Sequence, residues 1–150
     1  MSEIIESVKN LSIGFNSQKG KQISILRNVS TNIKKGETVG IVGESGSGKS
    51  TLALAMMGYI KQGLFPLKGE CLFKSEDLLK MSSRQLEKIR GRKIAMIPQN
   101  AGQALTPNLK IGYQIDEALK LHTNFNKNER EKKISELFQK KNLQNLSLKI

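Results

Sequence analysis

Residues 39–51 of the chain read VGIVGESGSGKST, and the rest of the sequence is best interpreted outward from this stretch. Four residues of strand character run into the pattern Gly-x-x-x-x-Gly-Lys-Ser, and a helix-forming run, LALAMM, follows at residues 52–57. A strand, a glycine-rich loop and a helix in this order form a phosphate-binding loop. A chance glycine-rich turn would not need the flanking strand and helix. The stretch therefore predicts a nucleotide site in an α/β protein.

The residue types in this loop suit phosphate binding. Glycines adopt backbone angles that a Cβ would penalise, so successive N–H groups can turn toward one anion. A helix that begins near Lys49 adds unpaired N–H groups and the positive end of its dipole. Lys49 is placed to reach the outer phosphates, and Ser50 to put its hydroxyl on Mg²⁺. The predicted nucleotide-binding residues of the loop are Gly43, Glu44, Ser45, Gly46, Ser47, Gly48, Lys49, Ser50 and Thr51.

Length and composition indicate a soluble globular protein. The chain has 150 residues, of which 37% are hydrophobic and 25% charged, so it can bury a core. No apolar run approaches the roughly 20 residues that span a bilayer. The N-terminus carries two acids and no basic region, unlike a secretory signal. The single cysteine, Cys71, indicates a reducing compartment, and its strand-like surroundings predict a buried, unreactive side chain.

The net charge of +12 is the one unusual bulk property. The 25 Lys and Arg residues are spread along the chain, whereas a nucleic-acid surface would be clustered and interleaved with aromatics. Only 5% of residues are aromatic. The charge suits an anionic nucleotide and the anionic cytoplasmic leaflet of a membrane, and nucleic acid is not expected as the main partner.

Hydrophobic patterning and turn residues predict the order of the elements. Alternation predicts a β-rich lead-in, and Gln99 is expected just beyond the carboxyl end of a buried strand, where open α/β sheets bind ligands. Ser82 with Gln85, and Asn126 or Asn128, are predicted helix caps. The expected strands are 8–15, 23–33, 38–42, 70–73 and 94–97, with a loop at 63–69, and the expected helices are 82–90, 111–121 and 127–141.

These motifs together resemble a known family. GESGSGKST at 43–51 and IRGRKIAMIPQ at 89–99 are similar to the nucleotide-binding subunit of ABC transporters. The further segments ALTP at 104–107, IGYQIDEAL at 111–119 and LH at 121–122 resemble the oligopeptide, dipeptide and nickel importer branch. The resemblance covers essentially the whole chain and implies the N-terminal part of one nucleotide-binding domain.

The resemblance implies a role for each site residue. Residues 43–51 would be the Walker A loop, and Gln99 the Q-loop glutamine that reaches Mg²⁺ and the attacking water. Lys49 and Gln99 would then be the catalytic residues, and Ser50 and Gln99 the metal-binding residues. Phe15 is the candidate for the aromatic side chain that stacks on adenine. The alternative for Phe15 is a plain inward-facing strand residue.

The resemblance also implies a fold class, an α/β P-loop NTPase core with an N-terminal antiparallel β subdomain and the start of a helical subdomain, incomplete in this chain. Residues 1–37 and 68–75 would belong to the β subdomain. Residues 38–66 and 92–99 would form the P-loop core, and 100–150 the start of the helical subdomain.

Several family motifs are expected downstream of the chain, namely the signature loop, the Walker B carboxylates, the D-loop and the switch histidine. Residues 115–117, Ile-Asp-Glu, resemble the end of a Walker B motif, but they follow Gly112, Tyr113 and Gln114 and suit a helix better. His122 is expected to be an exposed or partly packed helix residue. We therefore expect these 150 residues alone to bind nucleotide weakly and not to turn it over.

The resemblance predicts the ATP-binding subunit of an importer that couples ATP hydrolysis to uptake of peptides or of nickel and other metal complexes. Its cofactors would be ATP and Mg²⁺, and its location the cytoplasmic face of the membrane. Its partners would be permease subunits contacted through the Q-loop region, a second ATPase subunit in a head-to-tail dimer and, indirectly, a substrate-binding protein. The alternatives are a soluble ABC ATPase acting on nucleic acid or ribosomes, and a truncated product without function.

Overall fold

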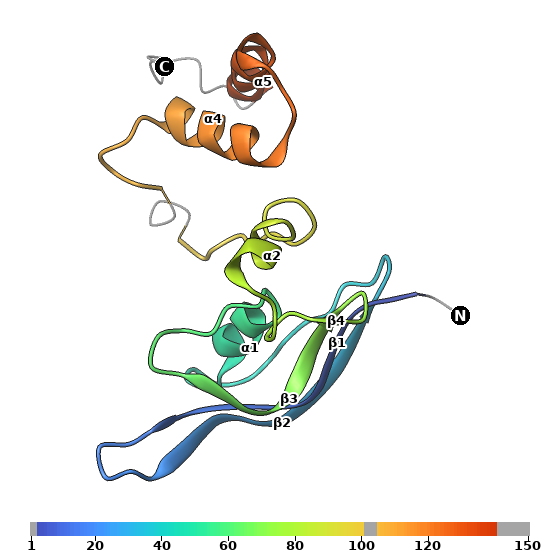
Figure 1. Ribbon diagram of the computed structural model, residues 1–150, viewed down its shortest axis with the longest axis vertical. Coiled ribbons are helices and arrows are strands. Elements are labelled where there is room, and N and C mark those ends of the chain that lie inside the picture. Colours follow the sequence, from blue (N-terminus) through green and yellow to red (C-terminus); the bar gives the residue numbers. More distant parts are fainter. Residues whose placement is uncertain (1–2, 101–104, 141–150) are drawn as a thin grey trace. The chain divides into compact units, whose positions relative to one another are not determined.

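The computed structural model describes residues 3–100 and 105–140. The chain divides into two compact units, Met1–Arg90 and Gly91–Ile150, and each is described by itself. Figure 1 follows the chain from the sheet of the first unit to the helices of the second.

The first unit is built on an antiparallel sheet with the strand order β2-β1-β3-β4 (Figure 1). Its central strand, β1, buries Val8, Leu11 and Ile13, which belong to the core of the unit. The alternation of apolar and polar residues places one side of each strand on this core. This confirms the predicted β-rich lead-in and the antiparallel arrangement that the resemblance implied. The strands are β1 (Ile4–Asn16), β2 (Gln22–Lys34), β3 (Phe65–Phe73) and β4 (Glu76–Asp77).

Strand β3 begins earlier than the sequence indicated. The predicted loop at 63–69 is wrong from Phe65 onward, because β3 already pairs with β1 there, with Pro66 opposite Ile13. Proline lacks an N–H and is tolerated only where a strand has no partner to donate to. Strand β4 pairs only with Leu72 and Phe73, so the N-terminal part of β3 has a partner on one side only among the described residues.

The first unit also contains two short helices. Helix α1 (Lys49–Ala55) starts directly at the glycine-rich loop and buries Leu52 and Ala55. Helix α2 (Ser83–Glu87) is shorter than predicted. Its Ser82 N–H donates to Gln85 Oε1 at 2.9 Å, which confirms the predicted capping pair.

The two expected strands at 38–42 and 94–97 are not formed. Both segments have no regular structure apart from a bridge residue at Ile94. Val42 is 95% exposed and Ile97 is 93% exposed, so the prediction that residues 94–97 form a buried strand is wrong in burial as well. A strand needs a neighbour for its backbone N–H and C=O groups, and neither segment has one among the described residues. The apolar residues of the two segments indicated strands, but they did not show that each strand needs a neighbouring strand in order to form.

The second unit contains helices α4 (Ile111–His122) and α5 (Lys127–Lys140), which contact each other. Both helices lie close to their predicted bounds, and residue 141 falls outside the described residues. The Arg130 Nε donates to Asp116 Oδ1 at 2.7 Å and joins the two helices. Asp116 therefore lies in a helix, as predicted, rather than in a Walker B strand, and the ion pair with Arg130 is an additional finding. In the part of the chain that the structure describes, no helix combines the length and the apolar character needed to cross a membrane.

Candidate nucleotide site

The side chain of Lys49 closes over the glycine-rich loop. Its Nζ donates to the carbonyl oxygens of Gly43 at 2.7 Å and Glu44 at 2.6 Å, and to Ser47 Oγ at 3.4 Å. The ammonium group therefore lies at the mouth of the loop, which is where outer phosphates bind in a loop of this type. Phosphate oxygens are better partners for an ammonium than amide carbonyls, because the bond joins opposite charges. A bound phosphate can thus take over the lysine's contacts.

The start of α1 is open to an anion. Its N-cap, Gly48, has φ 91° and makes no side-chain cap hydrogen bond, and no acidic residue lies in the first turn. The first N–H groups of a helix have no intrahelical partner, and the dipole makes this end positive. A Cβ at Gly48 would lie 2.7 Å from Leu26 Cδ2 on β2, so only glycine brings the helix this close to the sheet.

Most of the remaining loop residues are exposed to solvent. Glu44, Ser45 and Ser47 are exposed, and Ser50 is exposed in the first turn of α1, while Thr51 is half-buried. A Cβ at Gly43 would lie 2.9 Å from Ser47 Oγ, so the loop closes tightly on itself at this point. The open helix start, the ammonium and the exposed hydroxyl fit a nucleotide phosphate with Mg²⁺. When bound, Mg²⁺ would neutralise phosphate charge, and Ser50 is the residue in this unit that would hold it.

Phe15 and Gln99 are the two predicted site residues outside this loop. Phe15 lies near the end of β1, paired with Ile23, and is half-buried. Its role against adenine remains a prediction. Gln99 is exposed and belongs to the second unit, so its predicted place near Mg²⁺ also remains a prediction.

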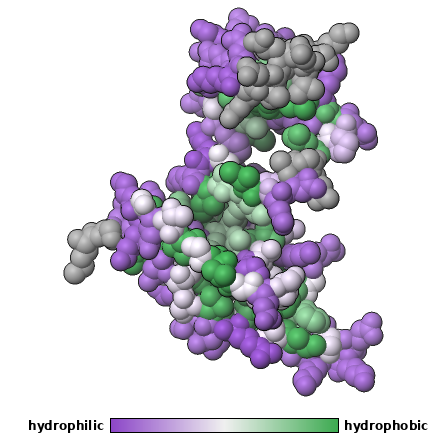
Figure 2. All heavy atoms as spheres, turned by 180° about the vertical axis from the view of Figure 1, so that it is seen from behind, coloured by the Kyte–Doolittle hydropathy of each residue, from purple (hydrophilic) through white to green (hydrophobic). Residues whose placement is uncertain are grey.

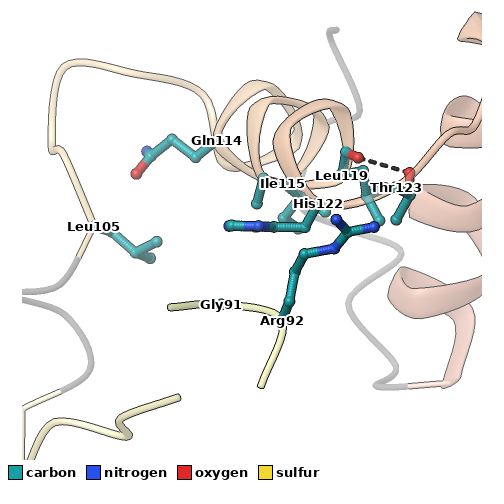
Figure 3. Close-up of a pocket in the computed structure, with 9 residues that line it drawn as sticks. Gly91, Arg92, Leu105, Gln114, Ile115, Leu119, His122 and Thr123 are labelled. Carbon is teal, nitrogen blue, oxygen red and sulfur yellow. Dashed lines mark hydrogen bonds between the residues drawn. The ribbon is translucent and has the colours of Figure 1, made fainter. Parts of the chain in front are cut away.

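A cavity of about 540 Å³ lies within the second unit. Apolar side chains of α4 line it together with polar groups, and Figure 3 shows Arg92 and His122 close together on one side and Gln114 on the other. The His122 ring packs against Gly91, which confirms the expected partly packed residue. Gln114 fixes the preceding loop, because its Oε1 accepts from Thr106 N–H at 2.9 Å and its Nε2 donates to Leu109 O at 3.0 Å.

Sequence reasoning did not identify this cavity. The sequence predicted a helix at 111–121, but not that Arg92 would line a cavity together with Ile115 and Leu119. Arg92 precedes the strand that was expected at 94–97. Because that strand is not formed, the sequence did not correctly indicate the direction of the Arg92 side chain.

A comparison with protein families decides the family. The model of the family described as "ABC transporter" matches residues 26–149, which is most of the chain. The chain belongs to the ABC transporter family. The match includes the glycine-rich loop, Gln99 and both helices of the second unit. The resemblance that the motifs indicated is therefore confirmed.

Curated relatives of this family member are peptide transport proteins. The chain is 40% identical over 134 residues to the oligopeptide transport ATP-binding protein OppD of Bacillus subtilis, covering 88% of this chain and 37% of OppD. It is 42% identical to the dipeptide transport ATP-binding protein DppD of Lactococcus lactis, covering 80% of this chain and 34% of DppD. The glutathione import ATP-binding protein GsiA of Salmonella paratyphi A is also 42% identical, and the alignment covers 81% of this chain and 20% of GsiA. The chain thus spans little more than a third of the length of OppD and less of the others.

Solved ABC structures share the fold. The ATP-binding cassette MJ0796, in a dimeric post-hydrolysis state bound to ADP and phosphate, superposes with a TM-score of 0.75 at 29% identity. The alignment covers 89% of this chain and 56% of MJ0796. A second dimeric structure of the same cassette gives a TM-score of 0.74. The predicted ABC ATPase fold class is confirmed by these neighbours.

Proposed function

We propose that this ABC family member is the ATP-binding part of an importer that takes up short peptides. One observation supports this most directly, namely the Lys49 ammonium held at the mouth of a glycine-rich loop that opens a helix. The relatives reported above are named for oligopeptide, dipeptide and glutathione transport. Peptides are therefore the cargo class with the most support, and uptake of nickel remains a prediction without support from these names.

In this proposal the chain binds ATP through charge and position rather than through covalent chemistry. Phosphoryl transfer is catalysed mainly by holding the phosphates in place and by neutralising their charge. The Lys49 ammonium would hold the outer phosphates, and the N–H groups at the start of α1 would bind the same oxygens. Gly48 keeps that helix start against β2, and Ser50 offers its hydroxyl to Mg²⁺. Gln99 would orient water, so the catalytic residues of this chain would be Lys49 and Gln99.

The proposal is tested by ATP affinity. Lys49→Ala should weaken ATP binding at least about tenfold, because a hydrogen bond to a charged group typically contributes 1.5–3 kcal/mol. Titration calorimetry with Mg-ATP measures the change. Lys61→Ala, an exposed lysine of the same unit, removes the same charge and should leave the affinity unchanged. Equal ATP affinities of Lys49→Ala and the unaltered chain would refute the nucleotide site.

The catalytic competence of these 150 residues is a separate part of the proposal. The residues proposed for the site, Lys49, Ser50 and Gln99, include no carboxylate that could polarise water, so we expect nucleotide binding with no measurable turnover. A second ATPase subunit is proposed as the head-to-tail partner. The dimeric state of the MJ0796 cassette supports this proposal, since that protein is 29% identical.

The permease is the proposed membrane partner, and the chain would lie at the cytoplasmic face of the membrane. The cavity of the second unit supports this, because it offers an open apolar surface lined by Leu105, Ile115 and Leu119. Residues after Gln99 in the sequence would then receive a permease segment, and a substrate-binding protein would act through the permease.

Co-purification tests this partner. Ala118→Glu places a carboxylate at an exposed α4 position that lines the cavity, so it should abolish co-purification with the permease from membranes. Lys120→Glu introduces a carboxylate at an exposed position on the same helix that is not among the lining residues, and it should leave the complex intact. Undiminished co-purification of Ala118→Glu would exclude this surface.

A further inference from the structure

The C-terminal end of α1 is closed by a specific arrangement of backbone bonds. The Tyr59 N–H donates to Leu54 O at 2.9 Å, and the Gly58 N–H donates to Ala55 O at 2.8 Å. Gly58 has φ 68°. These features form a Schellman motif, in which a left-handed residue ends the helix. The motif satisfies two carbonyl groups, and the carbonyl groups of Met57 and Gly58 are left to find partners elsewhere.

Arg90 supplies these partners from another element. Its Nε donates to Met57 O at 2.9 Å, and its Nη2 donates to Gly58 O at 2.8 Å. The guanidinium carbon lies 6.0 Å from the centroid of the Tyr59 ring. Arg90 is half-buried, and its own N–H donates to Leu86 O at 2.8 Å, which continues the last turn of α2. One planar guanidinium thus bonds two adjacent carbonyls and contacts the next side chain.

Packing around Gly58 shows that α2 and the end of α1 are fitted to each other. A Cβ at Gly58 would lie 2.6 Å from Leu86 Cδ2 and 3.1 Å from Leu78 O. Leu78 and Leu86 are both buried. Figure 1 shows α2 next to α1 in the first unit. The Arg90 fork, meaning the pair of hydrogen bonds from its Nε and Nη2, therefore forms at a close, partly buried contact. Charge-assisted hydrogen bonds are stronger there than at a fully exposed site.

We propose that Arg90 is a positioning residue for the nucleotide site, which fixes α1 from its C-terminal end and so holds the phosphate loop at the other end. The helix is seven residues long, about 10 Å, so movement of one end carries the other with it. Lys49 and Ser50 lie in its first turn, and Gly48 sets its contact with β2. The positive charge of Arg90 also complements the negative end of the helix dipole. This inference rests on the proposed nucleotide site.

The fork, rather than the charge alone, is the important feature. Arginine presents several N–H donors in a fixed plane, whereas lysine is a flexible point charge that cannot bond both carbonyls in this geometry. Arg90→Lys should therefore keep the charge and lose part of the positioning. Arg90→Met should keep much of the packing and lose both bonds.

The experiment measures ATP affinity and amide hydrogen exchange on the protein as its gene encodes it. Arg90→Met should weaken Mg-ATP binding roughly tenfold, since small misplacements of a binding group carry large penalties, and Arg90→Lys about threefold. Arg84→Met, an exposed arginine on α2, should bind like the unaltered protein. The N–H groups of Gly58 and Tyr59 should exchange faster in Arg90→Met, with the amides of β1 unchanged.

Several results would overturn the proposal. One is a normal ATP affinity in Arg90→Met, or in Arg90→Lys if the methionine variant does not fold. Another is an equal loss of affinity in Leu86→Ala, which empties a buried site of α2 but leaves the fork, because the effect would then follow general stability. A third is uniform acceleration of exchange in β1 and α1. If the unaltered protein does not bind ATP, the proposed function fails, and the exchange pattern still decides whether Arg90 fixes α1.

Discussion

At the scale of single residues, Glu6 has a pKa well above the ordinary value of a glutamate carboxyl group. It lies on β1 opposite Phe73, and Cys71 Sγ is 3.8 Å from its Oε1. Burial raises the pKa of Glu6 from 4.5 to about 7, partly offset by the bond from Cys71. Burial, and then the nearby Glu6 charge, raises the pKa of the Cys71 thiol to about 12. The prediction of a buried, unreactive cysteine agrees with this environment.

The raised pKa of Glu6 makes stability depend on pH. Between about pH 4.5 and 7 the folded chain holds a proton at Glu6 that the unfolded chain has released, so stability falls as pH rises through this window. Glu6→Gln stays neutral and should be more stable than the unaltered chain at pH 8, with a smaller difference at pH 5. Urea unfolding at both pH values measures this.

The exposed Glu87→Gln is the charge-matched control and should not alter the pH dependence. An unchanged slope of stability against pH in Glu6→Gln would show that Glu6 is ionised in the folded chain. Because Glu6 remains partly exposed, we expect the effect to be smaller than a fully buried carboxyl would give.

At the scale of elements, the start of α5 shows how one cap was selected from two candidates. The sequence allowed Asn126 or Asn128. In the structure, Asn126 Oδ1 accepts from Glu129 N–H at 3.0 Å, and Glu129 Oε2 accepts from Asn126 N–H at 2.7 Å. These reciprocal bonds form a capping box, and Asn128 lies within the first turn.

Asn126→Ala should therefore loosen the start of α5, while Asn128→Ala should not. Loss of an N-cap typically costs about 1 kcal/mol, so the amides of the first turns of α5 should exchange about fivefold faster in Asn126→Ala. Asn128→Ala replaces a poor helix former with a good one, so it should leave the amide exchange rates of α5 unchanged or lower them. Hydrogen exchange by NMR measures both. Faster exchange in Asn128→Ala than in Asn126→Ala would contradict the assigned cap.

The elements that the sequence predicted well depend on local information. The bounds of α4 and α5 follow from apolar spacing within their own lengths, and α5 also carries its cap locally. The strands expected at 38–42 and 94–97 failed because a strand is completed by its neighbours. The role of Arg90 was equally hidden, since the carbonyls that it bonds lie more than thirty positions earlier in the chain.

At the scale of the whole molecule, the main feature is two apolar segments that have no strand partner among residues 3–100 and 105–140. Val39, Ile41 and Val42 are exposed in the first unit, and Met96 and Ile97 in the second. Figure 2 shows apolar side chains reaching the surface in both units. A groove of about 290 Å³ runs beside residues 39–42, lined by side chains of β2 and α1. Surface of this kind usually marks a place where other protein packs.

These segments should make the 150-residue chain associate with itself. Extended apolar backbone with unpaired N–H and C=O groups is a template for pairing between chains. Val42→Lys and Ile97→Lys should each raise the concentration at which association begins at least about fivefold, because roughly 1 kcal/mol or more of apolar burial is lost. Thr38→Lys adds the same charge at an exposed position next to the first segment and should have a smaller effect. Sedimentation over a range of concentrations measures the change, and a chain that stays monomeric at about 100 μM without any substitution would show that these segments are protected in solution.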